Sequence, residues 1–95
     1  MTYVRYYRMT AREGQGTALR AVLETLLAKV EPLAGCQGVE LLNDADKADI
    51  YVLLERWTSG EAHKEGGRML GKEAFAPIMA VLSSPPESAS LNTLD

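Results

Sequence analysis

Few of the residues that build specialised sites occur in this sequence. Its 95 residues include one cysteine, one histidine, one tryptophan and one phenylalanine. Because Cys36 has no second cysteine to pair with, the chain forms no internal disulfide, which favours a reducing, cytoplasmic setting. One cysteine and one histidine, far apart in the sequence, cannot form a typical zinc site. We therefore expect a fold held together by packing, without a metal centre.

Long apolar runs, an excess of basic residues and phosphate-binding loops are also missing. No segment approaches the ~20 consecutive apolar residues of a membrane span, and residues 1–5 lack the apolar core of a signal peptide. The net charge is −3, whereas a nucleic-acid-binding protein needs a basic surface. Gly66-Gly67 lacks the lysine and hydroxyl of a phosphate-binding loop. We expect no membrane and no nucleic-acid partner, and a cofactor would have to bind without a known fingerprint.

Length and composition predict one globular domain over residues 1–95. The apolar share is 46%, which is ordinary for a globular protein. A chain of this size buries only roughly 60% of its unfolded surface. Additional burial in an oligomer would therefore help to stabilise it.

The first half of the chain predicts a strand, a helix and a hairpin. Residues 3–10 are rich in tyrosine and lack glycine and proline, which is typical of a strand. Strands over residues 38–43 and 49–57 flank a short polar turn, so they should pair antiparallel. Between these segments, apolar residues recur at the spacing of one helical stripe: Leu19, Val22, Leu23, Leu26, Leu27 and Val30.

The second half predicts two helices and a closing strand. Thr58–Glu61 resembles a capping box, and Gly66-Gly67 should end the short helix that follows it. A last helix should span about residues 72–83 and begin shortly before Pro77, because proline is tolerated only in the first turn. Alternating side chains predict a strand over residues 87–94.

This order of elements predicts an α+β fold of the split βαβ, ferredoxin-like type. Such an antiparallel sheet carries its helices on one face and leaves the other face open. The strand over residues 49–57 is apolar on both faces, so water alone should not cover the open one. We therefore expect a homodimer in which a second copy covers that face.

Three segments carry a pattern that extends over almost the whole chain. A turn at Arg12–Gln15 follows a strand of aromatic and basic residues, Pro32–Leu41 follows the first helix, and Tyr51–His63 contains a Glu-Arg-Trp run. These segments resemble the antibiotic biosynthesis monooxygenase family. The resemblance implies a dimeric α/β barrel with a pocket between the sheet and the helices of each subunit. It also implies oxidation of phenols, anthrones or quinols by molecular oxygen without flavin, haem or metal.

Trp57 and His63 are the candidate catalytic residues that this resemblance implies. The indole of Trp57 could stack on a flat substrate and donate a hydrogen bond, or it could be a core residue at the end of a strand. The imidazole of His63 could remove a substrate proton before oxygen reacts. It could also be an exposed helix residue without a role.

Candidate substrate-binding residues come from the strands and the last helix. Tyr7 and Tyr51 could hydrogen-bond substrate oxygens, although strand tyrosines more often point their hydroxyls to solvent. Because side chains alternate along a strand, Tyr51 should lie on the same face as Trp57. Phe75 and Met79 could line the pocket wall or belong to the core.

Arg8 and Arg56 could stabilise a phenolate or the reduced oxygen. Alternatively, these arginines could form structural ion pairs across the sheet or across the dimer. Glu55, next to Arg56 in the sequence, suggests such pairing.

Three functions remain open on the sequence alone. The first is a cofactor-independent monooxygenase acting on a phenolic, anthrone or quinol-type aromatic. The second is a non-enzymatic dimer that binds or senses a small ligand in the same cavity. The third is a haem-binding or haem-degrading relative, for which a single histidine is thin support.

Overall fold

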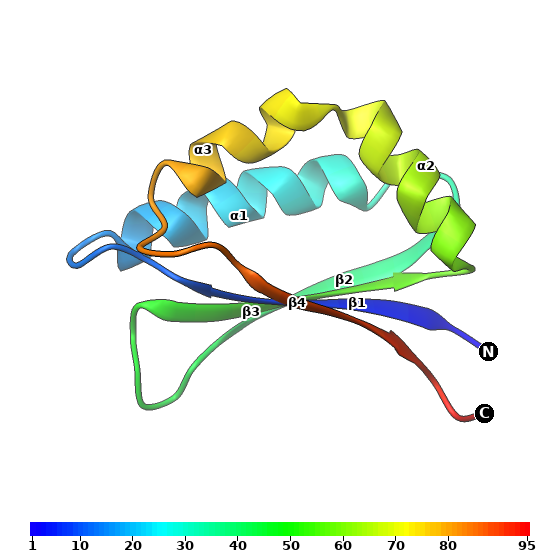
Figure 1. The fold of residues 1–95 in the computed structure, drawn as a ribbon, viewed down its shortest axis with the longest axis horizontal. Helices are drawn as coiled ribbons and strands as arrows, with labels where there is room; N and C mark the ends of the chain where they lie inside the picture. Colours follow the sequence, from blue (N-terminus) through cyan, green and yellow to red (C-terminus); the bar gives the residue numbers. More distant parts are fainter.

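A four-stranded antiparallel sheet forms the base of the protein in a computed structural model that describes residues 1–95 (Figure 1). The order across the sheet is β2-β3-β1-β4. This is the ferredoxin-like arrangement that the sequence predicts, and the predicted hairpin of β2 and β3 is confirmed. The strands are β1 (Tyr3–Thr10), β2 (Cys36–Asn43), β3 (Ile50–Trp57) and β4 (Glu87–Asn92).

All of the helices lie on one face of this sheet, as expected (Figure 1). They are α1 (Gly16–Val30), α2 (Gly60–Leu70), a 3₁₀ turn over Lys72–Phe75, and α3 (Ala76–Met79). None of them is long and apolar enough to cross a membrane. The predicted stripe of α1 does face the sheet, and four of its residues are fully or almost fully buried: Leu19, Leu23, Leu26 and Val30.

The prediction that Gly66-Gly67 ends a short helix is wrong. Helix α2 continues through both glycines to Leu70. The reason is tertiary packing, because α2 crosses the indole ring of Trp57 at Gly66. A β-carbon on Gly66 would lie 2.6 Å from the Cη2 atom of that ring. Glycine is therefore required here for close approach of the helix to the sheet, and tertiary contacts override its low helix propensity.

The prediction of one continuous last helix over residues 72–83 is also wrong. The segment consists of the 3₁₀ turn and the single turn of α3, which has Pro77 in its first turn. After α3 the backbone is drawn to the end of β1: the N–H of Ser83 donates to the carbonyl of Thr10, and the N–H of Arg12 donates to that of Val81. These bonds flank an isolated antiparallel bridge between Leu82 and Ala11, so the helix stops before it.

The core lies between the sheet and the helices. Alternation along β3 points Tyr51, Leu53, Glu55 and Trp57 toward the helices, and Trp57 is 2% exposed. From β1, Met9 joins the same core, with Tyr3 and Tyr7 packed against it. The shared face of Tyr51 and Trp57 that the sequence predicts is confirmed.

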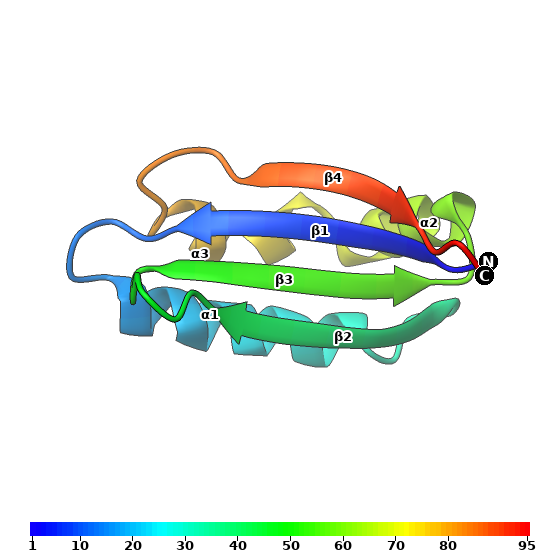
Figure 2. The same ribbon diagram turned by 90° about the horizontal axis from the view of Figure 1, so that it is seen from below.

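The other face of the sheet carries no helix (Figure 2). Its side chains include partly exposed Tyr6, Val52 and Leu54 in the middle of the sheet. Two cross-strand ion pairs flank this apolar centre: Arg8 with Glu87 at 3.8 Å, and Arg56 with Glu40 at 3.7 Å.

Replacing Gly66 by alanine should destabilise the protein. The added methyl group would overlap the buried Trp57 ring, and overpacking of this kind costs roughly 1–3 kcal/mol. We expect a lower urea midpoint for Gly66→Ala, measured by the fluorescence of Trp57, the single tryptophan.

Gly67→Ala is the matched control, because a β-carbon at that neighbouring helical position would meet nothing within 4 Å beyond its chain neighbours and its own helix backbone. The free energy of unfolding of this variant should rise by roughly 0.5–1 kcal/mol, because alanine has a better helix propensity than glycine. An equal gain in both variants would contradict the close packing of α2 on Trp57.

Candidate functional site

A small apolar cavity lies between the sheet and helices α1 and α3. Its volume is about 80 Å³. Only two of its ten lining residues, Tyr7 and Glu55, carry polar side chains. The other eight form the apolar wall: Met9, Leu23, Leu26, Leu53, Phe75, Ile78, Met79 and Pro86. The cavity is thus almost entirely apolar, and we call the part lined by Tyr7 and Glu55 its polar end.

Glu55 is a buried carboxyl group at this polar end. It is 5% exposed, because β3 turns it toward the helices between Leu53 and Trp57. The indole Nε1–H of Trp57 donates a hydrogen bond of 3.1 Å to its Oε1 atom. Burial raises the pKa of Glu55 above its ordinary value, while the bond from Trp57 and the charge of Arg5 oppose that shift.

His63 is held against this group by the first turn of α2. The Oγ atom of Ser59 accepts the N–H of Ala62 at 3.0 Å and caps the helix, within the segment where the sequence suggests a cap. The imidazole then packs edge-on to Trp57, with ring centroids 5.6 Å apart. Burial and the charge of Arg5 lower the pKa of His63 below 6.5, so it is neutral at pH 7.

A short chain of hydrogen bonds joins β1 to this histidine. Nε of Arg5 donates to the Tyr7 hydroxyl at 3.2 Å, and that hydroxyl lies 3.2 Å from Nε2 of His63. Because arginine can only donate, the Tyr7 oxygen accepts from it, and the tyrosine proton is free for the neutral imidazole. Burial raises the pKa of Tyr7. The Nε2 atom of His63 lies 3.9 Å from Oε1 of Glu55, too far for a hydrogen bond.

The structure brings together five of the candidate residues that the sequence suggests. Trp57, His63 and Tyr7 meet at the polar end of the cavity. Phe75 and Met79 lie at its opposite wall and remain 38% and 49% exposed. Of the two catalytic candidates, neither lines the cavity itself. Both contact it through Tyr7 and Glu55.

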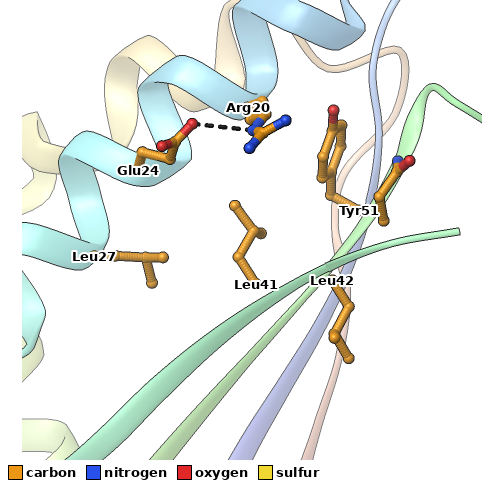
Figure 3. Close-up of a pocket in the computed structure, with 7 residues that line it drawn as sticks. Arg20, Glu24, Leu27, Leu41, Leu42 and Tyr51 are labelled. Carbon is orange, nitrogen blue, oxygen red and sulfur yellow. Dashed lines mark hydrogen bonds and ion pairs between the residues drawn. The ribbon is translucent and has the colours of Figure 1, made fainter.

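The other three candidates lie elsewhere. Tyr51 faces the helices but lines a separate groove between α1 and β2, together with Arg20 and Leu41 (Figure 3). Arg8 and Arg56 lie on the open face of the sheet, each in an ion pair. Arg56 pairs with Glu40 and not with Glu55, which points to the opposite face.

Sequence reasoning did not single out Glu55 or Arg5 as parts of a site. The available signal was the alternation of side chains along the strand. Glu55 shares a face with Leu53 and Trp57, and the strand is otherwise apolar on that face. A carboxylate at such a position is buried when the strand is covered, and buried carboxyl groups with perturbed pKa values mark functional sites. No group of three or more His, Cys, Asp or Glu residues is arranged to hold a metal ion.

The burial of Glu55 predicts a stability difference that depends on pH. Its pKa is raised in the folded state above 4.5, so ionisation of Glu55 destabilises the fold. That cost is absent below about pH 4, where the group is protonated in both states, and is complete above its folded pKa. Glu55→Gln removes the charge and keeps an oxygen for Trp57, so this variant should be more stable than the wild type at neutral pH.

The measurement is urea unfolding of both proteins between about pH 4 and pH 8. The two curves should converge at the acid end. His63, whose pKa is lowered, destabilises both proteins as the pH falls and therefore largely cancels in the difference. A stability difference that does not change with pH would contradict an ionised, buried Glu55.

Comparison with known proteins agrees with this fold. The family model described as antibiotic biosynthesis monooxygenase matches residues 2–65. The solved structure of Rv0793 from Mycobacterium tuberculosis is 26% identical, with a TM-score of 0.85, and the alignment covers 100% of this chain and 97% of that one.

A second solved structure is SnoaB from Streptomyces nogalater, described as a cofactor-independent oxygenase. It is 18% identical, with a TM-score of 0.83, and the alignment covers 99% of this chain and 94% of that one. No match is found among curated proteins. Since the family model matches more than half of the sequence, the chain belongs to the antibiotic biosynthesis monooxygenase family.

Proposed function

We propose that this protein is a cofactor-independent monooxygenase that oxidises a phenolic, anthrone or quinol-type aromatic with molecular oxygen. One observation carries the proposal: an apolar cavity beside a cluster of buried, hydrogen-bonded polar groups. The apolar walls suit a flat aromatic body, and the polar end suits its oxygen atoms and its most acidic proton. The description of SnoaB as a cofactor-independent oxygenase supports the same function.

In this reaction the substrate carries the redox chemistry. Removal of one proton gives an electron-rich anion, which reacts directly with oxygen. The protein orients the substrate, excludes water and holds the proton. Trp57 and His63 contribute by fixing the polar end of the cavity, since Trp57 donates to Glu55 and the Tyr7 hydroxyl lies 3.2 Å from His63.

Substrate entry requires the wall formed by Phe75 and Met79 to move. Pockets for small molecules are usually about 300–1,000 Å³, and this cavity is about 80 Å³. Both side chains are partly exposed and lie on the 3₁₀ turn and the one-turn helix α3. Elements this short have few internal hydrogen bonds, so they open at a low free-energy cost.

A homodimer is part of the proposal. The apolar centre of the open face at Tyr6, Val52 and Leu54 is the surface that a second copy would cover. The pairs Arg8–Glu87 and Arg56–Glu40 flank this centre, and we assign them to the rim of the dimer contact.

A small-ligand-binding protein without turnover is the alternative that the size of the cavity favours. A cavity of about 80 Å³ is large enough for a small apolar ligand without any movement of its wall. The haem-binding alternative has less support, because Nε2 of His63 is already engaged by Tyr7.

Oxygen uptake by the purified protein tests the function. With a panel of anthrones and hydroquinones, corrected for autoxidation, uptake should depend on the protein and need no added cofactor. Trp57→Phe and His63→Ala should each lower the rate by roughly ten-fold or more, because both disturb the hydrogen-bonded end of the cavity. Arg20→Gln, in the separate groove, is the matched control with an unchanged rate.

Each outcome of this assay has a clear meaning. Binding of a panel compound without oxygen uptake would favour the ligand-binding alternative. Unchanged turnover in both Trp57→Phe and His63→Ala would show that the reaction, if present, takes place outside this cavity.

Disruption of the open face should separate the proposed dimer. Leu54→Asp puts a charge in the centre of that face, and an unpaired buried charge strongly destabilises an interface. We expect wild-type protein to sediment as a dimer and Leu54→Asp as a folded monomer. Met69→Asp, on the exposed surface of α2 and 69% exposed before the change, is the control that should stay dimeric. Monomeric wild-type protein at micromolar concentration would contradict the proposal.

A further inference from the structure

Within the proposed oxygenase, we infer that Glu55 is the proton acceptor for the aromatic substrate. Its carboxylate takes the most acidic proton of the substrate and later returns it to the peroxide formed with oxygen. The inference rests on the proposed function, because it names the group that acts in the same cavity. It gives the catalytic role to a residue other than the histidine.

The lining of the cavity limits the choice of acceptor. Tyr7 and Glu55 are its only polar residues. The tyrosine hydroxyl is protonated at neutral pH, since burial raises its pKa further, and it therefore donates and does not act as a base. The carboxylate of Glu55 is the one group on the wall that can accept a proton from a bound molecule.

One oxygen of this carboxylate is free to do so. The bond from Trp57 and the approach of His63 both involve Oε1. Oε2 has no hydrogen-bond partner. Every fully buried side-chain nitrogen or oxygen in the chain has one, so Oε2 is not fully buried. Oε2 therefore keeps some exposed area, and we place it on the cavity because Glu55 is one of the residues that line that cavity.

His63 is better suited to positioning than to proton abstraction. Its Nε2 atom points to the Tyr7 hydroxyl at 3.2 Å, and its ring does not line the cavity. The imidazole packs against Trp57, which in turn donates to Glu55. His63 and Trp57 thus hold the carboxylate in one orientation, with Oε1 occupied and Oε2 without a partner.

The surroundings of Glu55 also make it a stronger base than an exposed carboxylate. The charged and titratable groups that face it are Arg5 and Tyr7 from β1 and His63 from α2. The wall of the cavity contributed by α1 and α3 is apolar. Burial raises the pKa of Glu55 above its ordinary value, and a carboxylate with a raised pKa accepts a proton more readily.

The proton and electron balance closes with oxygen as the only co-reactant. For anthrone, Glu55 takes one benzylic proton and leaves the anion. The anion gives its electron pair to oxygen, a carbon–oxygen bond forms, and the resulting peroxide anion takes the proton back from Glu55. The hydroperoxide then loses water to give the quinone, and the carboxylate is ready for the next cycle.

Hydrogen exchange in anthrone isolates the proposed step. Under nitrogen in heavy water, the protein should accelerate loss of the benzylic proton signal in the NMR spectrum. Glu55→Gln should slow this exchange by about 100-fold or more, the usual contribution of a general base. The KM for anthrone should change little, because Gln keeps the bond from Trp57 and the shape of the cavity.

Two further variants separate catalysis from positioning. Glu55→Asp restores a carboxylate and should recover part of the exchange rate. His63→Gln should slow exchange less than Glu55→Gln. In the wild type and in His63→Gln the exchange rate should fall as Glu55 becomes protonated at low pH, and in Glu55→Gln this dependence should disappear.

The outcomes distinguish this inference from the proposed function. Exchange that depends on Glu55, with no oxygen uptake in air, supports the inference and overturns the oxygenase. Oxygen uptake without anaerobic exchange, or equal exchange in wild type and Glu55→Gln, overturns the inference and leaves the oxygenase standing. A protein that accelerates neither process overturns both.

Discussion

The contact between Trp57 and helix α2 determines where every polar group of the site lies. The indole ring is almost fully buried at the end of β3, and α2 approaches it so closely that only glycine fits at residue 66. This approach brings His63, three residues before Gly66, against the edge of the ring. The indole N–H meanwhile points back along β3 to Glu55. One apolar side chain thus fixes a helix, an imidazole and a carboxyl group relative to one another.

The fold was readable from the sequence because its signals are local and repeated. The stripe of α1, the turn before Ile50 and the alternation along β3 each depend on residues a few positions apart. The two errors came from contacts between distant residues. Gly66 lies inside a helix because the ring of Trp57 occupies the space that a side chain at residue 66 would need. The last helix stops because residues 81–83 bond to the end of β1. No local pattern carries either constraint.

The site was readable only in part, for a related reason. Trp57 and His63 were found by resemblance, and Tyr7 by its residue type, but the resemblance did not predict their mutual geometry. Arg8 was indistinguishable in sequence from Arg5, three residues earlier, although β1 sends one to the open face and the other to the cavity side. Only their alternate positions along the strand distinguish the two arginines. That difference shows which of them faces the cavity only when the covered face of the sheet is known.

A single antiparallel sheet serves two purposes here because adjacent residues point to opposite faces. Along β3, Leu54 and Arg56 face outward, while Glu55 and Trp57 face the helices. A second copy on the outer face would shield the sheet from water on both sides. That shielding would lower the effective dielectric around the carboxyl group and further favour its protonated form. Association and the basicity of Glu55 are then physically linked, although no residue of the open face touches the cavity.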